Sequence, residues 1–321
     1  MEISENLLIK KLGKYGKTGG RVVRGIGDDG AVAKLDKGQY VFVQDAMVEH
    51  VHFEFSFLDP YFLGKKIIDV NVSDVLSMGA LPLYYLVTLG IPAHVTSKDI
   101  ERMYRGMRSA SRKFNVVLVG GDTVQSDTFF VDVSMTGRLV VKNYIGRDKA
   151  RAGDLIAVSG YLGEAAYGLA LLKQRSAAKG LSRFIRRFQD PAPPLALWKN
   201  LVKHDITLTM MDISDGLIVD LQRMMIESGK SAVVFIENIP VPNVLRKNGM
   251  IEFSLTGGED YQLLFTFPAR KLSKLESLKK EGHLISVIGE VKKGSGVRFY
   301  DHGKEVTFDK RGYEHFGERN G

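Results

Sequence analysis

Cysteine is absent from the 321 residues of this sequence. Its absence excludes structural disulfides, cysteine-based zinc sites and thiol nucleophiles. Any bound metal must therefore be held by oxygen or imidazole ligands. A site built from oxygen ligands favours magnesium, calcium or manganese.

Long apolar runs are missing as well. The longest one, Leu81 to Ile91, contains a proline and is too short to cross a bilayer. The first residues lack the apolar core of a signal peptide. We therefore expect a cytoplasmic protein with no membrane partner.

Acidic residues are in deficit, because the formal net charge is +8. A basic, solvated surface accounts for this excess, and attraction of phosphorylated ligands is the functional alternative. The basic residues are not interleaved with aromatic residues, and no zinc-finger motif accompanies them. We therefore expect no nucleic acid as a partner.

Glycine loops of the usual phosphate-binding kinds are lacking too. Residues 25–30 fit G-x-G-x-x-G, but the residues after them are typical of a strand, whereas a Rossmann turn opens a helix. Residues 11–18 partly match a P-loop, but a helical pattern precedes them where a P-loop needs a strand. A phosphorylated ligand must be bound in another way.

The length and composition are those of an ordinary globular protein of two domains. Asp59-Pro60 predicts the start of a helix that ends near Met78. Residues 116–119 predict a strand that stops at Gly120, and Asp215 is expected to open a helix. Helices and strands mix without strict alternation, so the fold class is α+β.

The pattern of strands and helices restarts near Lys149. We therefore place the domain boundary near residues 147–151, which gives an N-terminal domain of residues 1–148 and a C-terminal α+β domain of residues 149–321.

Aspartates recur next to glycine or other small residues, where a ligand can approach the backbone. They are Asp28, Asp29, Asp45, Asp74, Asp122, Asp212 and Asp215. Each one alone could be a helix cap or a turn residue. As a set, such carboxylates repel one another unless a cation lies between them. Magnesium fits this pattern, because it binds a few carboxylates together with substrate phosphates.

Seven motifs occur in a characteristic order: GIGDDGAV, VEHVHF, VNVSDVLSMGALP, VGGDT, GRDKARAGDLIAVSG, DISDGL and TGGEDYQLLF. With them the chain resembles the thiamine-phosphate kinase family, in the superfamily of aminoimidazole-ribonucleotide synthetase. The resemblance runs from about Leu7 to the tail that ends at Phe316. It implies an N-terminal α/β sheet domain that binds ATP and magnesium and dimerises, a C-terminal α+β domain, and a homodimer.

The resemblance also assigns roles to individual positions. The positions that match metal ligands are Asp29, Asp45, Asp74, Asp122, Asp212 and Asp215. Those that match ATP contacts are Tyr104, Gly121, Asp122, Arg147 and Ser214, and those near the thiamine phosphate are His52, Glu259 and Tyr313. Two positions depart from the family pattern. Val43-Gln44 replaces two hydroxyl residues, so the Gln44 amide is a substitute metal ligand and the number of metal ions is open; His50 replaces a glycine.

The implied reaction is the ATP-dependent phosphorylation of thiamine monophosphate to thiamine diphosphate. A phosphate monoester has a second pKa near ~6, so it is largely dianionic at neutral pH and needs no catalytic base. We therefore expect direct, in-line transfer aided by several Mg²⁺ ions, with no catalytic side chain and with Asp74 and Asp212 the most critical ligands. Two alternatives are another ATP-using enzyme like aminoimidazole-ribonucleotide synthetase and a non-catalytic nucleotide-binding regulator.

Overall fold

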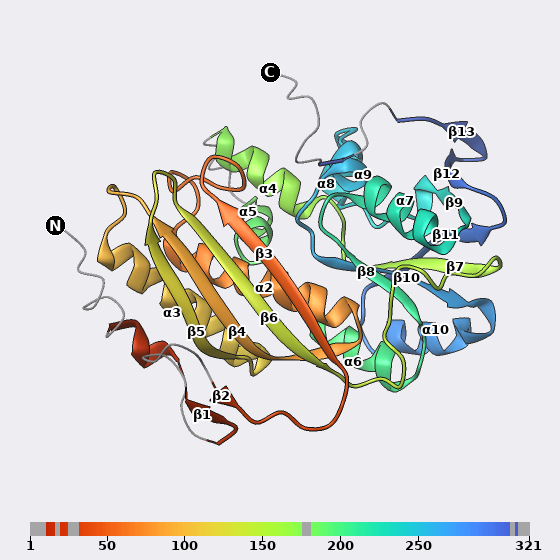
Figure 1. The fold of residues 1–321 in the computed structure, drawn as a ribbon. Coiled ribbons are helices and arrows are strands. Elements are labelled where there is room, and N and C mark those ends of the chain that lie inside the picture. The colour runs from red at the N-terminus through yellow and green to blue at the C-terminus, as the bar shows by residue number, and fades with distance from the viewer. Residues whose placement is uncertain (1–10, 17–19, 25–31, 175–180, 309–311, 314–321) are drawn as a thin grey trace. The chain divides into compact units, whose positions relative to one another are not determined.

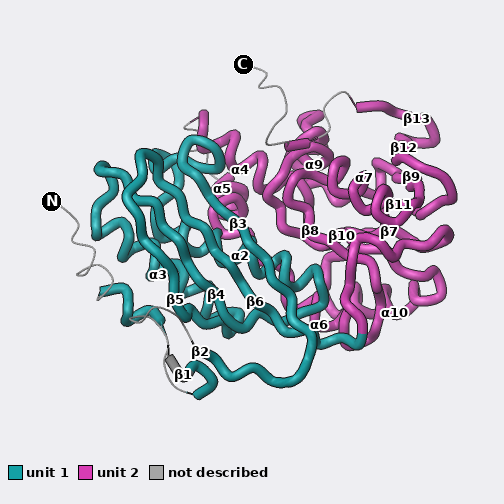
Figure 2. Tube along the Cα trace, viewed as in Figure 1, with its two compact units in different colours: residues 1–142 teal, residues 143–321 magenta. Residues whose placement is uncertain are grey.

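The computed structural model describes residues 11–16, 20–24, 32–174, 181–308 and 312–313. The chain divides into two compact units, Met1–Lys142 and Asn143–Gly321 (Figure 2). Each unit has its own main sheet and its own helices (Figure 1). In the part of the chain that is described, no helix is long and apolar enough to cross a membrane.

Unit 1 is built on a four-stranded sheet with the strand order β3-β6-β4-β5. β4 and β5 are parallel, whereas β6 is antiparallel to both of its neighbours. A separate small sheet pairs β1 with β2. The elements are η1 (Gly13–Tyr15), β1 (Val22–Arg24), β2 (Val32–Ala33), β3 (Tyr40–Val48), α2 (Pro60–Ser77), β4 (Ala80–Ile91), α3 (Ser97–Phe114), β5 (Val117–Gln125) and β6 (Phe130–Leu139).

Helix α2 begins where its sequence signals predict. The Asp59 side chain accepts a hydrogen bond from the Tyr61 backbone N–H at 2.8 Å, and Pro60 stands in the first turn, where its missing N–H costs nothing. The helix ends at Ser77, one residue before the predicted end. Helix α3 begins with a capping box between Thr96 and Asp99.

Helices α2 and α3 touch through their backbones. A Cβ atom placed on Gly64 of α2 would lie 1.9 Å from the Met103 carbonyl oxygen, and one on Gly106 of α3 would lie 1.9 Å from that of Tyr61. Only glycine fits at either position. The two helices therefore form one layer on a single face of the sheet, behind the strands in Figure 1.

The opposite face of this sheet carries exposed apolar side chains. Along β3, Val41 and Met47 are buried, whereas Phe42, with the opposite orientation, is 76% exposed. Leu86 of β4 and Val124 of β5 are exposed as well. No described helix of unit 1 covers this open face.

Strand β5 runs through Gly120 and Gly121 to Gln125, so the prediction that it stops at Gly120 was wrong. The two glycines pair with Leu86 and Val87 of β4. A Cβ atom on Gly121 would lie 1.9 Å from the Val87 carbonyl oxygen. Glycine therefore permits a close approach of the two strands here instead of ending one of them.

Unit 2 is built on a seven-stranded sheet with the order β13-β12-β9-β11-β7-β10-β8. All neighbouring strands are antiparallel except β12 and β9. The strands are β7 (Asp154–Ser159), β8 (Thr209–Ile213), β9 (Ser231–Phe235), β10 (Gln262–Pro268), β11 (Ile285–Lys292), β12 (Gly296–Asp301) and β13 (Lys304–Val306). The helices are α4 (Glu164–Lys173), α5 (Ser182–Gln189), α6 (Leu195–Lys203), α7 (Leu217–Ser228), η2 (Ile236–Asn238), α8 (Asn243–Lys247), α9 (Glu252–Thr256), η3 (Ala269–Lys271) and α10 (Leu272–Lys280).

Helix α7 packs its apolar side on this sheet. Its residues Leu217, Leu221 and Met224 belong to one buried cluster with residues of β7, β8, β9, β10 and β11. The predicted helix start at Asp215 lies two residues before the observed first residue, Leu217. The loop between β8 and α7 is therefore held between a central strand and a buried helix.

Candidate functional site

In unit 2, three distant segments meet at the loop that joins β8 to α7. The Glu259 backbone N–H donates to the Ser214 carbonyl at 2.8 Å, and the Tyr261 N–H donates to the Ile213 carbonyl at 2.9 Å. The Tyr313 N–H donates to the Asp215 carbonyl at 3.1 Å. The DISDG, GGED and Gly312-Tyr313 motifs are thereby joined into one site.

Four of the predicted site residues are brought together in this way: Ser214, Asp215, Glu259 and Tyr313. Ser214, Asp215 and Glu259 are half-buried, whereas Tyr313 is exposed. Partial burial, Asp215 and Glu259, in that order, raise the pKa of the Tyr313 hydroxyl. The Tyr313 hydroxyl therefore lies close enough to both carboxylates for their negative charge to raise its pKa.

Asp212 lies nearby on β8, where it pairs with Leu263 of β10 and is almost fully buried. Asp220, in the first turn of α7, is also buried. Burial, then Asp212 and then Asp215 raise the pKa of Asp220 to about 7, against the opposing effect of hydrogen bonds and Arg223. Three carboxylates therefore repel one another at this end of β8.

Arg223 partly compensates this repulsion. Its Nη1 contacts the carboxylate of Asp215 and lies 3.2 Å from Oδ1 of Asp220. These acidic neighbours raise the pKa of the guanidinium despite the opposing effect of its burial. Since an arginine side chain remains charged, Arg223 holds a permanent positive charge between the two aspartates.

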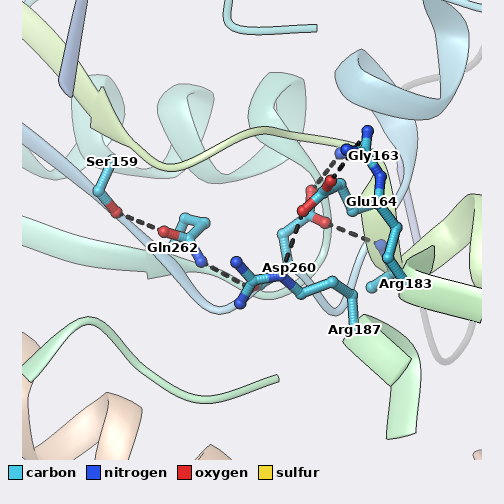
Figure 3. Close-up of polar contacts among 8 residues, drawn as sticks. Ser159, Gly163, Glu164, Arg183, Arg187, Asp260 and Gln262 are labelled. Carbon is cyan, nitrogen blue, oxygen red and sulfur yellow. Dashed lines mark hydrogen bonds and ion pairs between the residues drawn. The ribbon is translucent and has the colours of Figure 1, made fainter. Parts of the chain in front are cut away.

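The GGED loop has an unusual backbone. Glu259 and Tyr261 have φ angles of 67° and 47°, a region that residues other than glycine rarely adopt. Between them, the carboxylate of Asp260 is buried and accepts hydrogen bonds from the backbone N–H groups of Gly163, at 2.6 Å, and Ala165, at 3.2 Å (Figure 3). The start of α4 thus anchors the loop that carries Glu259.

Burial raises the pKa of Asp260 to about 7, although the two amide hydrogen bonds act in the opposite direction. Its neighbour in space, Glu164, is buried and forms ion pairs with Arg187, at 3.2 Å, and Arg183, at 3.6 Å, on α5 (Figure 3). The loop is therefore linked through α4 to α5.

Arg147 does not lie at this end of β8. Gly146 pairs with Thr209, the first residue of the strand, and Arg147 is exposed beside it. Ser214 follows the other end of the strand, five residues away, which corresponds to roughly 17 Å. Within unit 2, Arg147 is thus separate from Ser214, with which it was predicted to contact ATP.

In unit 1, two carboxylates lie in one row across the sheet. Asp132 of β6 and Asp122 of β5 both pair with Thr88 of β4, so two strand spacings, roughly 10 Å, separate them. The Gln44 amide donates to Asp132 at 2.8 Å. Gln44 and Asp122 are therefore on the open side of the sheet.

Two other predicted ligands occupy different places in unit 1. Asp45 follows Gln44 on β3, so its side chain points to the helix-covered face. Asp74 is in the last turn of α2, next to Val75, which packs over Gly137. Gly137 is four residues along β6 from Val133, the partner of Asp45, or roughly 13 Å. Asp45 therefore lies on the helix-covered side of the sheet, opposite the open side that carries Gln44 and Asp122.

The remaining predicted residues of unit 1 have packing partners. His52 Nδ1 accepts a hydrogen bond from the Val48 backbone N–H at 3.0 Å. Tyr104 is buried against Tyr15, with ring centroids 5.5 Å apart. Burial, with a smaller effect of Tyr85, raises the pKa of the Tyr104 hydroxyl. Asp29, a predicted metal ligand, lies outside the described residues.

Sequence reasoning missed four residues of these sites: Asp132, Asp220, Arg223 and Asp260. Alternation along β6 could have found Asp132, since Val131 and Val133 face the core. Asp260 lies inside the quoted TGGEDYQLLF motif, although no role was assigned to it. Asp220 and Arg223 act through contacts between separate segments, and no quoted motif contains them.

The donors at both sites are carboxylate, amide and hydroxyl oxygens, which suit a hard cation such as Mg²⁺. Among the described residues, no group of three or more histidine or acidic side chains is assembled to hold a metal. Magnesium does not require such a cage, because it commonly binds one or two carboxylates together with substrate phosphates and water. The donor set therefore fits a cation that arrives with a phosphorylated ligand.

Comparison with known proteins accounts for nearly the whole chain. Residues 27–139 match the AIR synthase related protein N-terminal domain, and residues 151–302 match the corresponding C-terminal domain. The thiamine-monophosphate kinase of Aquifex aeolicus is 35% identical over 300 residues, which cover 91% of this chain and 92% of that protein.

Two solved structures are similar along almost their full length. The thiamine-monophosphate kinase of Stenotrophomonas maltophilia matches with a TM-score of 0.83 and 28% identity, over 95% of this chain and 99% of that one. A structure described as "AaThiL complexed with AMPPCP and TMP" matches with a TM-score of 0.77 and 31% identity, over 98% and 99%. The α+β fold with two sheets is that of these proteins, and the chain belongs to the thiamine-monophosphate kinase family of AIR synthase related proteins.

Proposed function

We propose that this chain transfers the γ-phosphoryl group of ATP to thiamine monophosphate and so forms thiamine diphosphate. The observation that carries this proposal is its match to a relative in complex with AMPPCP and TMP, at 31% identity over 98% of this chain. AMPPCP is an analogue of ATP whose γ-phosphoryl group cannot be transferred. The backbone hydrogen bonds that join the segments of Ser214, Asp215, Glu259 and Tyr313 support a site for this reaction in unit 2.

In this proposal the substrate phosphate attacks the γ-phosphorus in line. A bond forms between a phosphate oxygen of thiamine monophosphate and the γ-phosphorus, and the bond to the β,γ-bridging oxygen breaks, which releases ADP. The attacking phosphate is largely dianionic at neutral pH because its second pKa is near ~6. The chain therefore has to orient two polyanions, and it needs no side chain that removes a proton.

Glu259 and Tyr313 are assigned to thiamine monophosphate, Glu259 for its negative charge towards the cationic thiazolium and Tyr313 for stacking on a ring. Their common attachment to the Ser214-Asp215 loop supports this role. His52 is a further substrate contact by resemblance, and its Nδ1 accepts a hydrogen bond from the Val48 backbone N–H. Ser214, Gly121, Asp122, Tyr104 and Arg147 are assigned to ATP.

Mg²⁺ would neutralise phosphate charge when bound and is assigned to the oxygens of Asp29, Gln44, Asp45, Asp74, Asp122, Asp212 and Asp215. Support comes from the excess of carboxylates at the end of β8, where three aspartates face one arginine. On the open side of unit 1, Asp122 and Asp132 provide two further carboxylates, and their strand positions are about 10 Å apart.

We also propose that the enzyme is a cytoplasmic homodimer, with residues 1–148 binding ATP and Mg²⁺ and forming the dimer contact. The open sheet face of unit 1 supports the dimer, because Phe42, Leu86 and Val124 are exposed apolar side chains on three strands of this sheet. Sedimentation equilibrium tests this directly, and a purely monomeric protein at micromolar concentration would contradict it.

A coupled assay of ADP release tests the reaction. Thiamine monophosphate should support turnover in the presence of Mg²⁺, whereas thiamine and the aminoimidazole-ribonucleotide precursor should not. Turnover with the precursor alone would assign the chain to the other chemistry of the superfamily. Binding of ATP with no turnover on any of the three substrates would indicate a nucleotide-binding regulator.

A further inference from the structure

Every backbone polar group of the turn at residues 214–216 already has a partner within the chain. The three successive N–H groups of Ser214, Asp215 and Gly216 all donate to Oδ2 of Asp220, at 3.1, 3.0 and 3.1 Å. The carbonyls of the same residues accept from the N–H groups of Glu259, Tyr313 and Asp220, at 2.8, 3.1 and 3.0 Å. A ligand at this turn therefore finds no backbone N–H free to bind it.

Three consecutive N–H groups that point to one place form a binding site for an anion. In many phosphate-binding proteins such a group of amides, next to the start of a helix, holds the phosphate itself. Here the turn leads into α7, and the anion that fills it is the carboxylate of Asp220, which is 0% exposed. The chain thus supplies an internal anion at the place where a phosphate could bind.

Asp220 also fixes the direction of the Asp215 side chain. Arg223 contacts the carboxylates of both aspartates through the same nitrogen, Nη1. Because Asp220 is buried and held by three amides, it positions the guanidinium, which in turn holds Asp215. Loss of Asp220 would therefore free the three amides of the turn and also remove the carboxylate that positions Arg223 beside Asp215.

We propose that Asp220 is a positioning residue of the phosphoryl-transfer site: its carboxylate fills the amide group of residues 214–216, so that this turn offers a ligand the Ser214 hydroxyl and the Asp215 carboxylate rather than backbone amides. The proposal rests on the proposed function for its kinetic consequences. The binding of the Asp220 carboxylate by the three amides does not depend on that function, and it is tested separately.

The test is to replace Asp220 with glycine and to add a small anion. The Asp220→Gly variant should lose about 100-fold in kcat with thiamine monophosphate, since displacement of a positioning loop by about 1 Å has an effect of this size. Excess sodium formate, whose carboxylate is small enough for the vacated space, should raise the kcat of this variant at least about tenfold. Sodium chloride at equal ionic strength should restore none.

Thermal unfolding supplies the readout that does not depend on kinase activity. Formate and inorganic phosphate should raise the Tm of Asp220→Gly more than that of the unmodified enzyme, because only the variant has an open amide site. If the unmodified enzyme proves to lack kinase activity, this difference in Tm still tests the anion site. Equal shifts in both proteins would overturn the proposal.

Asp154→Gly is the matched control. Asp154 is also buried and also accepts a backbone N–H, that of Arg151 at 3.0 Å, but it lies at the start of β7. Its replacement should lower the Tm without changing kcat, and formate should not affect its activity. A merely structural role for Asp220 would give this same result, which would contradict the proposal.

If Asp220→Gly does not fold, Asp220→Asn provides the second variant. The asparagine keeps an oxygen that can accept from the turn but loses the charge that holds Arg223. It should fold, keep its KM for thiamine monophosphate within about threefold, and lose kcat. An unchanged kcat in a folded Asp220→Asn enzyme would refute the positioning role.

Discussion

Replacement of Asp260 with asparagine should remove a pH dependence from the stability of unit 2. The buried Asp260 carboxyl has a pKa of about 7 in the folded protein, against 3.8 for an ordinary aspartate. The folded state therefore binds this proton more tightly than the unfolded state. The stabilisation is complete below the unfolded pKa and is lost as the pH rises through the folded pKa.

The size of the effect follows from the difference between the two pKa values. An increase from 3.8 to about 7, at about 1.4 kcal/mol per pH unit, corresponds to about 4 kcal/mol. The unfolding free energy contributed by this group should thus fall by about 1.4 kcal/mol for each pH unit between pH ~4 and pH ~7. Above that range the contribution is constant, because the carboxyl is ionised in both states.

Urea unfolding of the enzyme and of Asp260→Asn, followed by fluorescence of Trp198, which is buried in unit 2, measures this difference at several pH values. The pH dependence that Asp220 and other groups contribute is present in both proteins, so it cancels when one curve is subtracted from the other. Asparagine does not titrate, and the remaining difference should move in its favour by up to about 4 kcal/mol towards pH ~8. Parallel curves would show that Asp260 ionises normally in the folded state and refute the reasoning.

Three further outcomes are expected. His50→Gly should raise the unfolding free energy by about 1 kcal/mol, measured by chemical denaturation, because His50 has a φ of 67° that costs an L-residue more than a glycine; no gain would mean that the histidine side chain compensates. Gly121→Ala should destabilise unit 1 by roughly 3 kcal/mol, since its methyl group would lie 1.9 Å from the Val87 carbonyl oxygen, and a Tm equal to that of the parent enzyme would contradict this. Asp74→Asn should lower kcat about 100-fold at saturating ATP with unchanged circular dichroism, and full activity would remove Asp74 from the proposed ligands.

Sequence signals predicted the ends of helices and strands where the interactions that set them are made by neighbouring residues. Asp59 and Pro60 mark the start of α2 because a cap and a missing N–H act within one turn. The end of β5 was wrong for a physical reason: glycine weakens an isolated strand, but here the neighbouring strand at Val87 comes so close that glycine is required.

The candidate site was predictable only in part. The motifs identified Ser214, Asp215, Glu259 and Tyr313, and the structure joins them by backbone hydrogen bonds. Asp220 escaped attention because an aspartate in the first turn of a helix is commonly a surface residue that interacts with the helix N-terminus. Its importance comes from the turn that folds back over it, and this contact depends on the packing of α7 against the sheet.

The motifs also could not predict which side of the sheet a residue faces. Gln44 and Asp45 are adjacent in the sequence and were assigned to one kind of ligand, yet alternation along β3 sends them to opposite faces. A motif shows which residues occur together, whereas the strand period decides which of them can reach the same ion. The register with β6 and β4 then supplies Asp132 as a neighbour of Asp122 that no motif contains.

The contact between Gly64 and Gly106 has a mechanical consequence. Where main chain lies against main chain, no side chain is present whose change of rotamer could absorb a displacement. Atomic radii then fix the separation of α2 and α3, and changes in the distance between the two helices should be small. Movements of unit 1 that accompany ligand binding should therefore arise outside this pair of helices, which would move as one body.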